Sequence, residues 1–354
     1  MIIIFNFCYL LLLSLFFLGY KYSRSVEIKG VFTFLFLVVI FFVYSMRGID
    51  SGVDYSAYID VYTKSLILGE IDEYLLSNEI GYQFINYIGA IVLQLEHEVF
   101  FGFVGVLIWI FLCFRFDRVN IYFVVLSITA GYLYSSFNTI RQAIALSIFI
   151  YSLFYLIDNK KVRYYSSNIV AFFFHKSAII TFMFPLLTRV YYNKNILLIL
   201  YFFSLPFVFF PLSGEVFRTV ALYVSKWMSF IDYSYILEYG EFQTESERLS
   251  SGLGVMYNIA CNIFIIWQSN KSIEKNDNSK IVFLLFFSGC FFQNIFFAIE
   301  SVNRILMYFV YLKPLAFSLI IDSEPSKLTK CIVTLLSLGY IVLFLYSPPV
   351  TSLR

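Results

Sequence analysis

Charged residues are scarce in this chain. Only 14% of its 354 residues are charged and 60% are hydrophobic, whereas about a quarter of the residues in a soluble globular domain carry a charge. The apolar positions also run on without the regular polar alternation of a soluble helix or strand. The composition therefore excludes a soluble enzyme or binding module and indicates an integral membrane protein.

Neither sign of charge is in excess, because 25 Lys and Arg residues stand against 23 Asp and Glu residues. Nucleic-acid-binding proteins usually carry a clear basic excess gathered on one face. Here the basic residues are spread through short loops, so they report membrane topology instead. We expect no nucleic-acid partner.

Cysteine and histidine are rare as well, with five and two copies. The cysteines are isolated, and no two of them have the spacing of metal ligands, so they are interpreted as small hydrophobic residues. The chain also contains no Walker loop, no G-x-S-x-G turn, no H-E-x-x-H motif and no Asp-x-Asp pair. The sequence predicts neither a metal site nor a cofactor.

Apolar runs recur from one end of the chain to the other, and about 17 or more apolar residues suffice to span a bilayer. Two further segments are less regular: residues 81–95 are short, and residues 164–187 are interrupted by His175-Lys176-Ser177. We expect an all-α polytopic membrane protein of about 10 to 12 transmembrane helices, with one or two re-entrant or interrupted segments. Spans are expected at residues 2–20, 30–46, 99–114, 120–136, 141–157, 196–212, 254–269, 281–298, 305–321 and 329–347.

The distribution of basic residues orients these spans. If the two irregular segments dip into the membrane and return, or lie along its surface, most basic residues fall in cytoplasmic loops. These loops are residues 21–29, 115–118, 158–163, 189–194, 271–280 and 327–330. The same arrangement places most of the polar clusters described below on the outer face, and His175 joins them only if residues 164–187 re-enter far enough.

We expect a single integral membrane domain over residues 1–354, with long external loops at about 47–78 and 213–253. The first apolar stretch has no basic residue before it and no small-residue cleavage site after it, so it is expected to be a retained helix. The second loop is expected to form an amphipathic helix at the membrane interface or over a cleft. Its apolar residues at near-helical spacing are Phe217, Val220, Tyr223, Val224 and Trp227.

A cluster of charged and aromatic residues follows the second apolar run directly. Charges near a bilayer are costly unless they pair or meet a polar substrate, so this cluster is a candidate site. Its carboxylates and tyrosines suit sugar hydroxyls and its arginine suits a phosphate; alternatively, the cluster caps a helix and seals the span with an Arg-Asp pair. Its members are Arg47, Asp50, Asp54, Tyr55 and Tyr58.

Two further motifs stand at the mouths of spans. Glu79, three residues before Tyr82, could act as a general base if burial raised its pKa, or serve only as a helix N-terminal charge. Arg141, followed by Gln142, opens an apolar helix. An arginine binds a diphosphate through two parallel hydrogen bonds, although snorkelling at the interface is the competing interpretation.

Three more residues are candidates on position alone. His175, near Ser177, could orient a substrate or move a proton, or it could be an ordinary packing residue. Arg304 offers a second phosphate-binding cation, or pairs with Glu300 to join two helices. The other histidine, His97, lies between two glutamates and is interpreted as solvated.

Taken in order, four segments of the sequence resemble the EpsG family, which is grouped with the Wzy-type O-antigen and capsule polymerases. They are RGIDSGVDYSAYIDVY, NEIGYQFIN, NTIRQAIALSIFIYSLFYL and FFFHKSAIITFMFPLL. The resemblance covers roughly residues 46–187 and, more loosely, the Asn303-Arg304 turn. Each motif alone is weak, but four in sequence are fairly specific.

The resemblance implies a multi-pass glycosyltransferase of the bacterial inner membrane that makes a capsule or exopolysaccharide. It would join undecaprenyl-diphosphate-linked oligosaccharide repeat units on the periplasmic side without a metal, and a chain-length regulator and a flippase are its candidate partners. The residues that the resemblance and the motifs assign to catalysis are Asp50, Asp54, Glu79 and His175. Those assigned to substrate binding are Arg47, Tyr55, Tyr58, Tyr82, Arg141, Gln142, Ser177 and Arg304.

Two other functions share the hydropathy pattern. A repeat-unit flippase or transporter predicts polar residues along a central pathway open to both faces, whereas here they gather mostly at one face. A membrane acyltransferase would use His175 as its base but would leave the acidic and basic motifs without a role.

Overall fold

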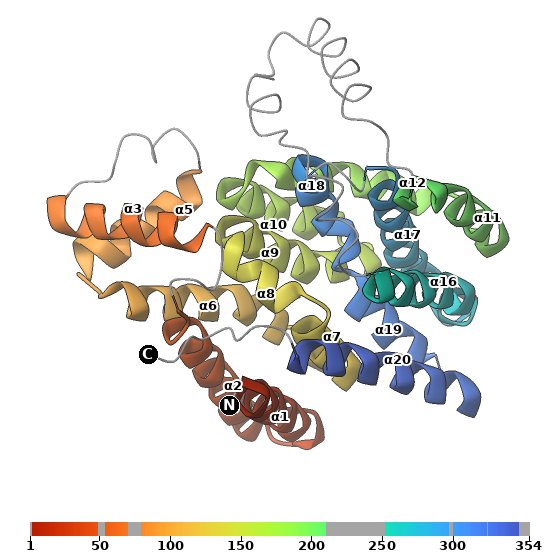
Figure 1. Ribbon diagram of the computed structural model, residues 1–354, viewed down its shortest axis with the longest axis horizontal. Helices are drawn as coiled ribbons and strands as arrows, with labels where there is room; N and C mark the ends of the chain where they lie inside the picture. Colours follow the sequence, from red (N-terminus) through yellow and green to blue (C-terminus); the bar gives the residue numbers. More distant parts are fainter. Residues whose placement is uncertain are drawn as a thin grey trace, which may run out of the picture. The chain divides into compact units, whose positions relative to one another are not determined.

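The computed structural model describes residues 2–48, 54–69, 79–209, 252–296, 300–323 and 325–346, and these contain helices but no strand. Figure 1 shows the helices in chain order. The predicted all-α class is confirmed. The first predicted external loop is described over residues 54–69, which contain a helix at Tyr55–Leu68, whereas nearly all of the second loop, including the segment from Phe217 to Trp227, lies outside the described residues.

The chain divides into two compact units, and the first comprises Met1–Pro185 with Phe317–Arg354. Its helices are α1 (Ile2–Tyr22), α2 (Val26–Ser45), α3 (Tyr55–Leu68), α5 (Ile80–Asn86), α6 (His97–Cys113), α7 (Ile121–Thr129), α8 (Tyr132–Asn138), α9 (Ile140–Ile157), α10 (Lys161–Phe174) and α20 (Lys327–Leu345). Shorter turns of other helix types lie at Tyr87–Val92 and Phe116–Arg118. The single-domain organisation stays a prediction.

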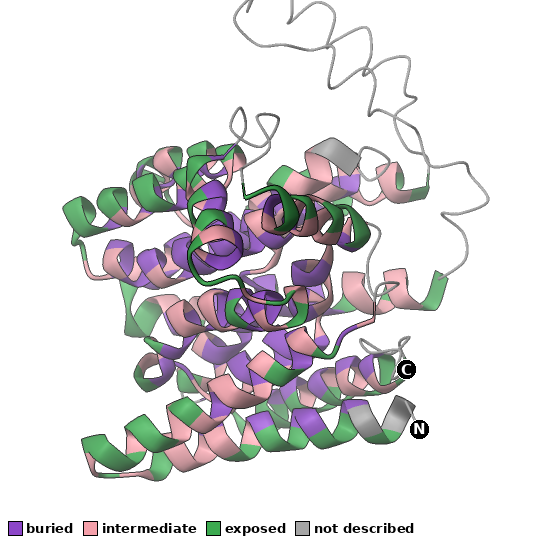
Figure 2. Cartoon of the chain, turned by 90° about the vertical axis from the view of Figure 1, so that its left-hand side faces the viewer, coloured by how far each residue is buried: buried purple, intermediate pink, exposed green. Residues whose placement is uncertain are grey.

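Helix α9 forms the core of the first unit. In its most apolar window 83% of the residues are buried, against 17% in α2, and Figure 2 shows many exposed residues on the helices beside the N-terminus. Small side chains such as Ala143 and Ser147 let neighbouring helices approach α9. Asn168 of α10 donates a hydrogen bond to Ser152 of α9 at 2.8 Å, which gives a buried amide a partner within the core.

The second unit comprises Leu186–Ala316. Buried polar side chains join its helices: Asn262 donates to the hydroxyl of Tyr201 at 3.1 Å, and Asn294 donates to Ser204 at 2.8 Å. Its helices are α11 (Lys194–Ser204), α12 (Pro206–Phe209), α16 (Gly252–Lys275), α17 (Lys280–Ile295) and α18 (Glu300–Val310). Helix α19 (Lys313–Asp322) contains the boundary between the two units.

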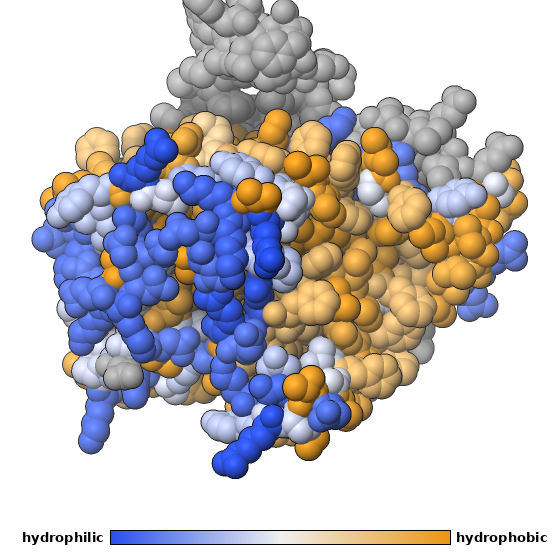
Figure 3. Space-filling view, turned by 180° about the vertical axis from the view of Figure 1, so that it is seen from behind, coloured by the Kyte–Doolittle hydropathy of each residue, from blue (hydrophilic) through white to orange (hydrophobic). Residues whose placement is uncertain are grey.

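Four helical segments are long and apolar enough to cross a membrane: Val26–Ser45, Ile140–Ile157, Val302–Asp322 and Lys327–Leu345. Shorter apolar helices lie at Asn6–Tyr22, Ile80–Val92, His97–Cys113 and Lys194–Phe209. Many large apolar side chains face outward, and Figure 3 shows a broad hydrophobic area on the surface. The chain is a membrane protein, while the count of about 10 to 12 spans stays a prediction.

Three of the predicted spans are each divided into two helices. Residues 120–136 form α7 and α8, because Gly131 takes a left-handed conformation with φ 96°. Residues 196–212 form α11 and α12, with Pro206 opening the second helix, where its missing N–H costs little. Residues 305–321 include most of α18 and α19, with a short turn at residues 311–312 inside the apolar segment Val302–Asp322.

Loops predicted to share the cytoplasmic face meet at one end of the first unit. Lys21 donates hydrogen bonds to the carbonyls of Asp117 and Val119 at 3.0 and 2.9 Å. Arg118 forms an ion pair with Asp158 at 2.7 Å. Three of the basic loops are therefore neighbours, and the polar site described next lies at the other end of α9; the cytoplasmic side of these loops stays a prediction.

Gly289 allows α17 to lie directly against α18. A Cβ at Gly289 would come within 2.4 Å of the Phe309 Cβ and 3.1 Å of the Phe309 carbonyl carbon. Gly289→Ala is therefore expected to lower the thermal midpoint of the detergent-purified protein, since overpacking costs about 1–3 kcal/mol. The control is Gly30→Ala, whose Cβ would meet nothing within 4 Å; equal midpoints for the two variants would contradict the expectation.

Candidate active site

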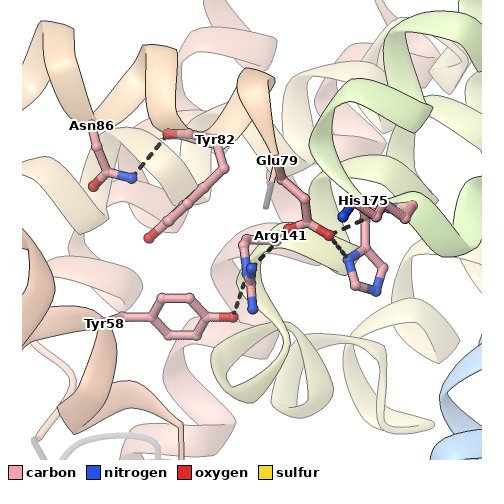
Figure 4. Close-up of polar contacts among 7 residues, drawn as sticks. Tyr58, Glu79, Tyr82, Asn86, Arg141 and His175 are labelled. Carbon is pink, nitrogen blue, oxygen red and sulfur yellow. Dashed lines mark hydrogen bonds and ion pairs between the residues drawn. The ribbon is translucent and has the colours of Figure 1, made fainter. Parts of the chain in front are cut away.

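A buried glutamate brings together three parts of the chain that lie far apart in the sequence. Glu79 is 8% exposed and precedes α5 in an extended conformation. One carboxylate oxygen lies 3.0 Å from the Nη1 of Arg141. The other contacts the Nδ1 of His175 and accepts a hydrogen bond from the backbone N–H of Lys176 at 3.3 Å. Figure 4 shows the carboxylate between the arginine and the histidine.

His175 reaches Glu79 because the helix before it stops. Helix α10 ends at Phe174, and His175 is extended, with φ −157° and ψ 124°. A 3-10 helix follows from Lys176 to Arg189. This agrees with the interruption expected within residues 164–187, whereas re-entry of that segment into the membrane stays a prediction. The change of direction turns the imidazole out of the helix register and toward the carboxylate.

Gly81 permits this contact between α5 and the end of α10. A Cβ at Gly81 would lie 3.0 Å from the carbonyl oxygen of Phe173 and 3.1 Å from its carbonyl carbon. Backbone atoms cannot move aside as a flexible side chain can. The close approach therefore favours glycine, since a larger residue would push the end of α10 away by a few tenths of an ångström.

Arg141 lies in the first turn of α9, so its side chain leaves the buried helix at its end. Besides its ion pair with Glu79, its Nε donates a hydrogen bond to the hydroxyl of Tyr58 at 3.3 Å. Burial raises the pKa of Tyr58 and the positive charge of Arg141 opposes that rise, with a net upward shift. The side chain of Arg141 is 33% exposed, against 6% for that of Glu79. A third of the Arg141 side chain is therefore exposed and accessible to a ligand.

Tyr82 and Asn86 form the wall of the site behind Arg141. Tyr82 is buried, and its ring meets that of Tyr58 edge-on at 5.7 Å between centroids. Asn86 donates to the carbonyl of Tyr82 at 2.9 Å (Figure 4). The charges of both Arg141 and Arg47 act on the Tyr82 phenol. Two guanidinium groups from distant motifs therefore lie near one tyrosine.

Arg47 is enclosed by aromatic rings. Its guanidinium carbon lies 3.5 Å from the ring centroid of Tyr55, 5.2 Å from those of Phe101 and Phe137, and 5.5 Å from that of Tyr44. The side chain donates to the carbonyl of Phe137 at 3.3 Å and is 5% exposed. Burial lowers the pKa of Arg47. This cage joins the end of α2 to α3, α6 and α8, so Arg47 has little surface for the phosphate that the sequence predicted it to reach.

Four other predicted site residues lie in the described part of the chain, while Asp50 lies outside it. Asp54 is half-buried and directly precedes α3. Gln142 is buried in α9, and Ser177 is half-buried in the turn after His175. Arg304 lies half-buried in α18 of the second unit. The half-exposed His97 pairs with Glu98 at 3.2 Å.

One participant was not among the predicted site residues: the backbone N–H of Lys176. Every residue except proline has such a group, so only the fold shows which one is used. The described residues therefore bring together Tyr58, Glu79, Tyr82, Arg141 and His175 as one site. It combines a partly exposed cation, a histidine held by a carboxylate, and phenol groups.

Comparison with known proteins identifies one family. The family model described as the EpsG family matches residues 29–352, nearly the whole chain. No curated protein and no solved structure matches the chain.

The ion pair of Glu79 with Arg141 can be tested by a double-mutant cycle on thermal stability. Glu79→Gln and Arg141→Gln are expected to destabilise the purified protein non-additively, with a coupling of about 0.5–3 kcal/mol, because each removes the same contact. Glu79→Gln combined with Arg118→Gln is the control, since Arg118 pairs with Asp158 instead. Additive losses in the first cycle would contradict the contact.

Proposed function

Because the chain belongs to the EpsG family, we propose that it polymerises undecaprenyl-diphosphate-linked oligosaccharide repeat units. Family membership indicates a polysaccharide polymerase-type function, and the apolar helices make it a membrane protein. The proposal adds the lipid-linked substrate, the periplasmic face of the bacterial inner membrane and a metal-independent glycosyl transfer. The observation that carries it is the contact of one buried carboxylate with both Arg141 and His175.

Arg141 is the proposed contact for the donor diphosphate. A guanidinium donates two parallel hydrogen bonds to phosphate oxygens and keeps its charge. Glu79 and the Tyr58 hydroxyl fix two of its nitrogen atoms, while a third of the side chain stays exposed. In this role Arg141 stabilises the negative charge that develops as the undecaprenyl diphosphate leaves.

His175 is the proposed base and Glu79 its positioning residue. Glu79 holds Nδ1, and the second ring nitrogen lies on the side of the ring away from the carboxylate (Figure 4). That nitrogen would take the proton from the acceptor sugar hydroxyl, whose oxygen attacks the anomeric carbon of the donor. The bond from this carbon to the diphosphate oxygen breaks, and the carrier leaves with the electron pair.

Tyr58 is proposed to line the sugar-binding part of the site, since a phenol ring packs against apolar faces and its hydroxyl forms hydrogen bonds. The buried Tyr82 would support the Tyr58 ring through their edge-on contact. Arg47 is assigned a positioning role through its aromatic cage. Asp54 and Arg304 stay candidates for acceptor binding. A chain-length regulator and a flippase stay the proposed protein partners.

The most direct test uses purified protein and lipid-linked repeat units in detergent with a metal chelator present. The wild type is expected to produce a ladder of polymer lengths on a gel. Arg141→Ala is expected to abolish the ladder, because removing an electrostatic contact to the leaving group costs about 100-fold to 1,000-fold in rate. Arg189→Ala is the control, since Arg189 is exposed and its charge is also removed.

A ladder from Arg141→Ala as long as that of the wild type would overturn the role of Arg141. A ladder that requires added divalent metal would overturn the metal-independent mechanism. Export of intact single repeat units from vesicles, without any ladder, would favour a transporter.

The role of His175 predicts a separate kinetic effect. His175→Asn is expected to lower kcat by about 100-fold to 10,000-fold, the usual contribution of a general base, with little change in the KM for the donor. Lys176→Ala is a matched control, because it keeps the backbone N–H that donates to Glu79. A raised donor KM with kcat unchanged in His175→Asn would assign the histidine to binding and contradict its role as base.

A further inference from the structure

A second cluster of cations and tyrosines lies at the opposite end of α9 from Glu79. Helix α9 contains 18 residues, and at 1.5 Å per residue its ends are about 27 Å apart. We name this the Arg115 cluster; it consists of Arg115, Tyr151, Tyr155 and Arg163. The proposed polymerase reaction uses none of these residues.

Arg115 stands over both tyrosines. Its guanidinium carbon lies 4.2 Å from the ring centroid of Tyr151 and 4.5 Å from that of Tyr155, and its Nε donates to the carbonyl of Tyr151 at 3.2 Å. The guanidinium also interacts with the Tyr155 hydroxyl, while its buried Nη2 has no hydrogen bond of good geometry among the described residues. A buried N–H without an acceptor is costly, so this nitrogen indicates a position for an acceptor atom.

Arg163 approaches the same tyrosines from α10. Its guanidinium carbon lies 5.8 Å from the ring centroid of Tyr155, and the hydroxyls of Tyr151 and Tyr155 are 2.6 Å apart. The charges of Arg115 and Arg163 both act on both hydroxyls. Arg163 is exposed, so water screens part of the repulsion between these two like charges, and an anion between them would offset the rest.

The nearest carboxylate at this end of α9 already has cationic partners. Asp158 lies 2.7 Å from Arg118 and 3.7 Å from Lys160. Burial raises the pKa of Asp158, but the hydrogen bond and charge of Arg118, with the charges of Lys160 and Arg115, lower it overall. The carboxylate is therefore charged at neutral pH and pairs directly with Arg118 and Lys160, while its effect on Arg115 is weaker. An additional anion beside Arg115 and Arg163 would complete the charge balance of the cluster.

Exposed apolar side chains border the cluster. Phe114, next to Arg115, is 58% exposed, and Val162, next to Arg163, is 83% exposed. We propose that Arg115, Arg163 and the hydroxyls of Tyr151 and Tyr155 bind the phosphate of an anionic phospholipid. Its acyl chains would cover the bordering apolar side chains, which a free phosphate would leave exposed. Basic pockets between transmembrane helices are suited to such head groups.

The test is native mass spectrometry of the full chain in mild detergent with equal amounts of phosphatidylglycerol and phosphatidylcholine. The wild type is expected to retain phosphatidylglycerol preferentially. Arg115→Gln with Arg163→Gln is expected to weaken that retention roughly 30-fold, from the usual contribution of two cations to binding an anionic head group. Tyr151→Phe with Tyr155→Phe keeps the rings, removes the hydroxyls and is expected to weaken retention a few-fold.

The control is Arg24→Gln with Arg189→Gln, which removes the same charge from two exposed arginines and is expected to retain phosphatidylglycerol as the wild type does. The proposal is overturned if the control loses as much as the Arg115 and Arg163 variant, or if that variant binds like the wild type. Competition by inorganic phosphate at the concentration of the lipid would also overturn it. If the arginine variant does not fold, unchanged retention by the tyrosine variant is decisive against the site.

Discussion

The polar end of the first unit depends on the burial of one carboxylate. A buried charge is stable only when it is paired and hydrogen-bonded, and removing one partner of such a pair typically costs about 3–5 kcal/mol. Glu79 meets this requirement with Arg141 from α9, and with His175 and the Lys176 N–H from the segment after α10. The need to satisfy Glu79 therefore holds three elements in one geometry, and the close approach at Gly81 makes that geometry possible.

Helix α9 is apolar and buried along most of its length, and each of its ends lies at a cluster that is proposed to bind an anion. Its first turn carries Arg141, and its last turns carry Tyr151 and Tyr155 below Arg115. Between these ends nearly every side chain is buried. Under the two proposals, one end binds the diphosphate of the substrate and the other the phosphate of a membrane lipid. The buried stretch keeps them separate, because an apolar helix interior offers no path for a charge.

Aromatic rings lie against several arginines, and they enclose these arginines to different degrees. The chain has 44 phenylalanines and 29 tyrosines, and cation–π contacts stabilise a guanidinium that has lost water. Around Arg47 four rings leave 5% of the residue exposed. The Arg115 guanidinium carbon lies 4.2 and 4.5 Å from the centroids of two tyrosine rings, and that of Arg141 lies 5.7 Å from the Tyr58 ring. The degree of enclosure, which no motif reveals, separates a packing arginine from one that can meet a ligand.

The sequence by itself determined the membrane class, the helical fold, the family and the residue types of the site, because apolar runs and motif order are local properties of the chain. It also predicted the interruption at His175, since His-Lys-Ser inside an apolar run conflicts with a continuous span. Only the tertiary structure decided that Glu79, Arg141 and His175 meet while Arg47 is enclosed. The physical reason is that burial and pairing depend on which distant segments pack together. The sequence shows only that a residue is an arginine or a glutamate, and not whether its side chain is enclosed by other residues or exposed to a ligand.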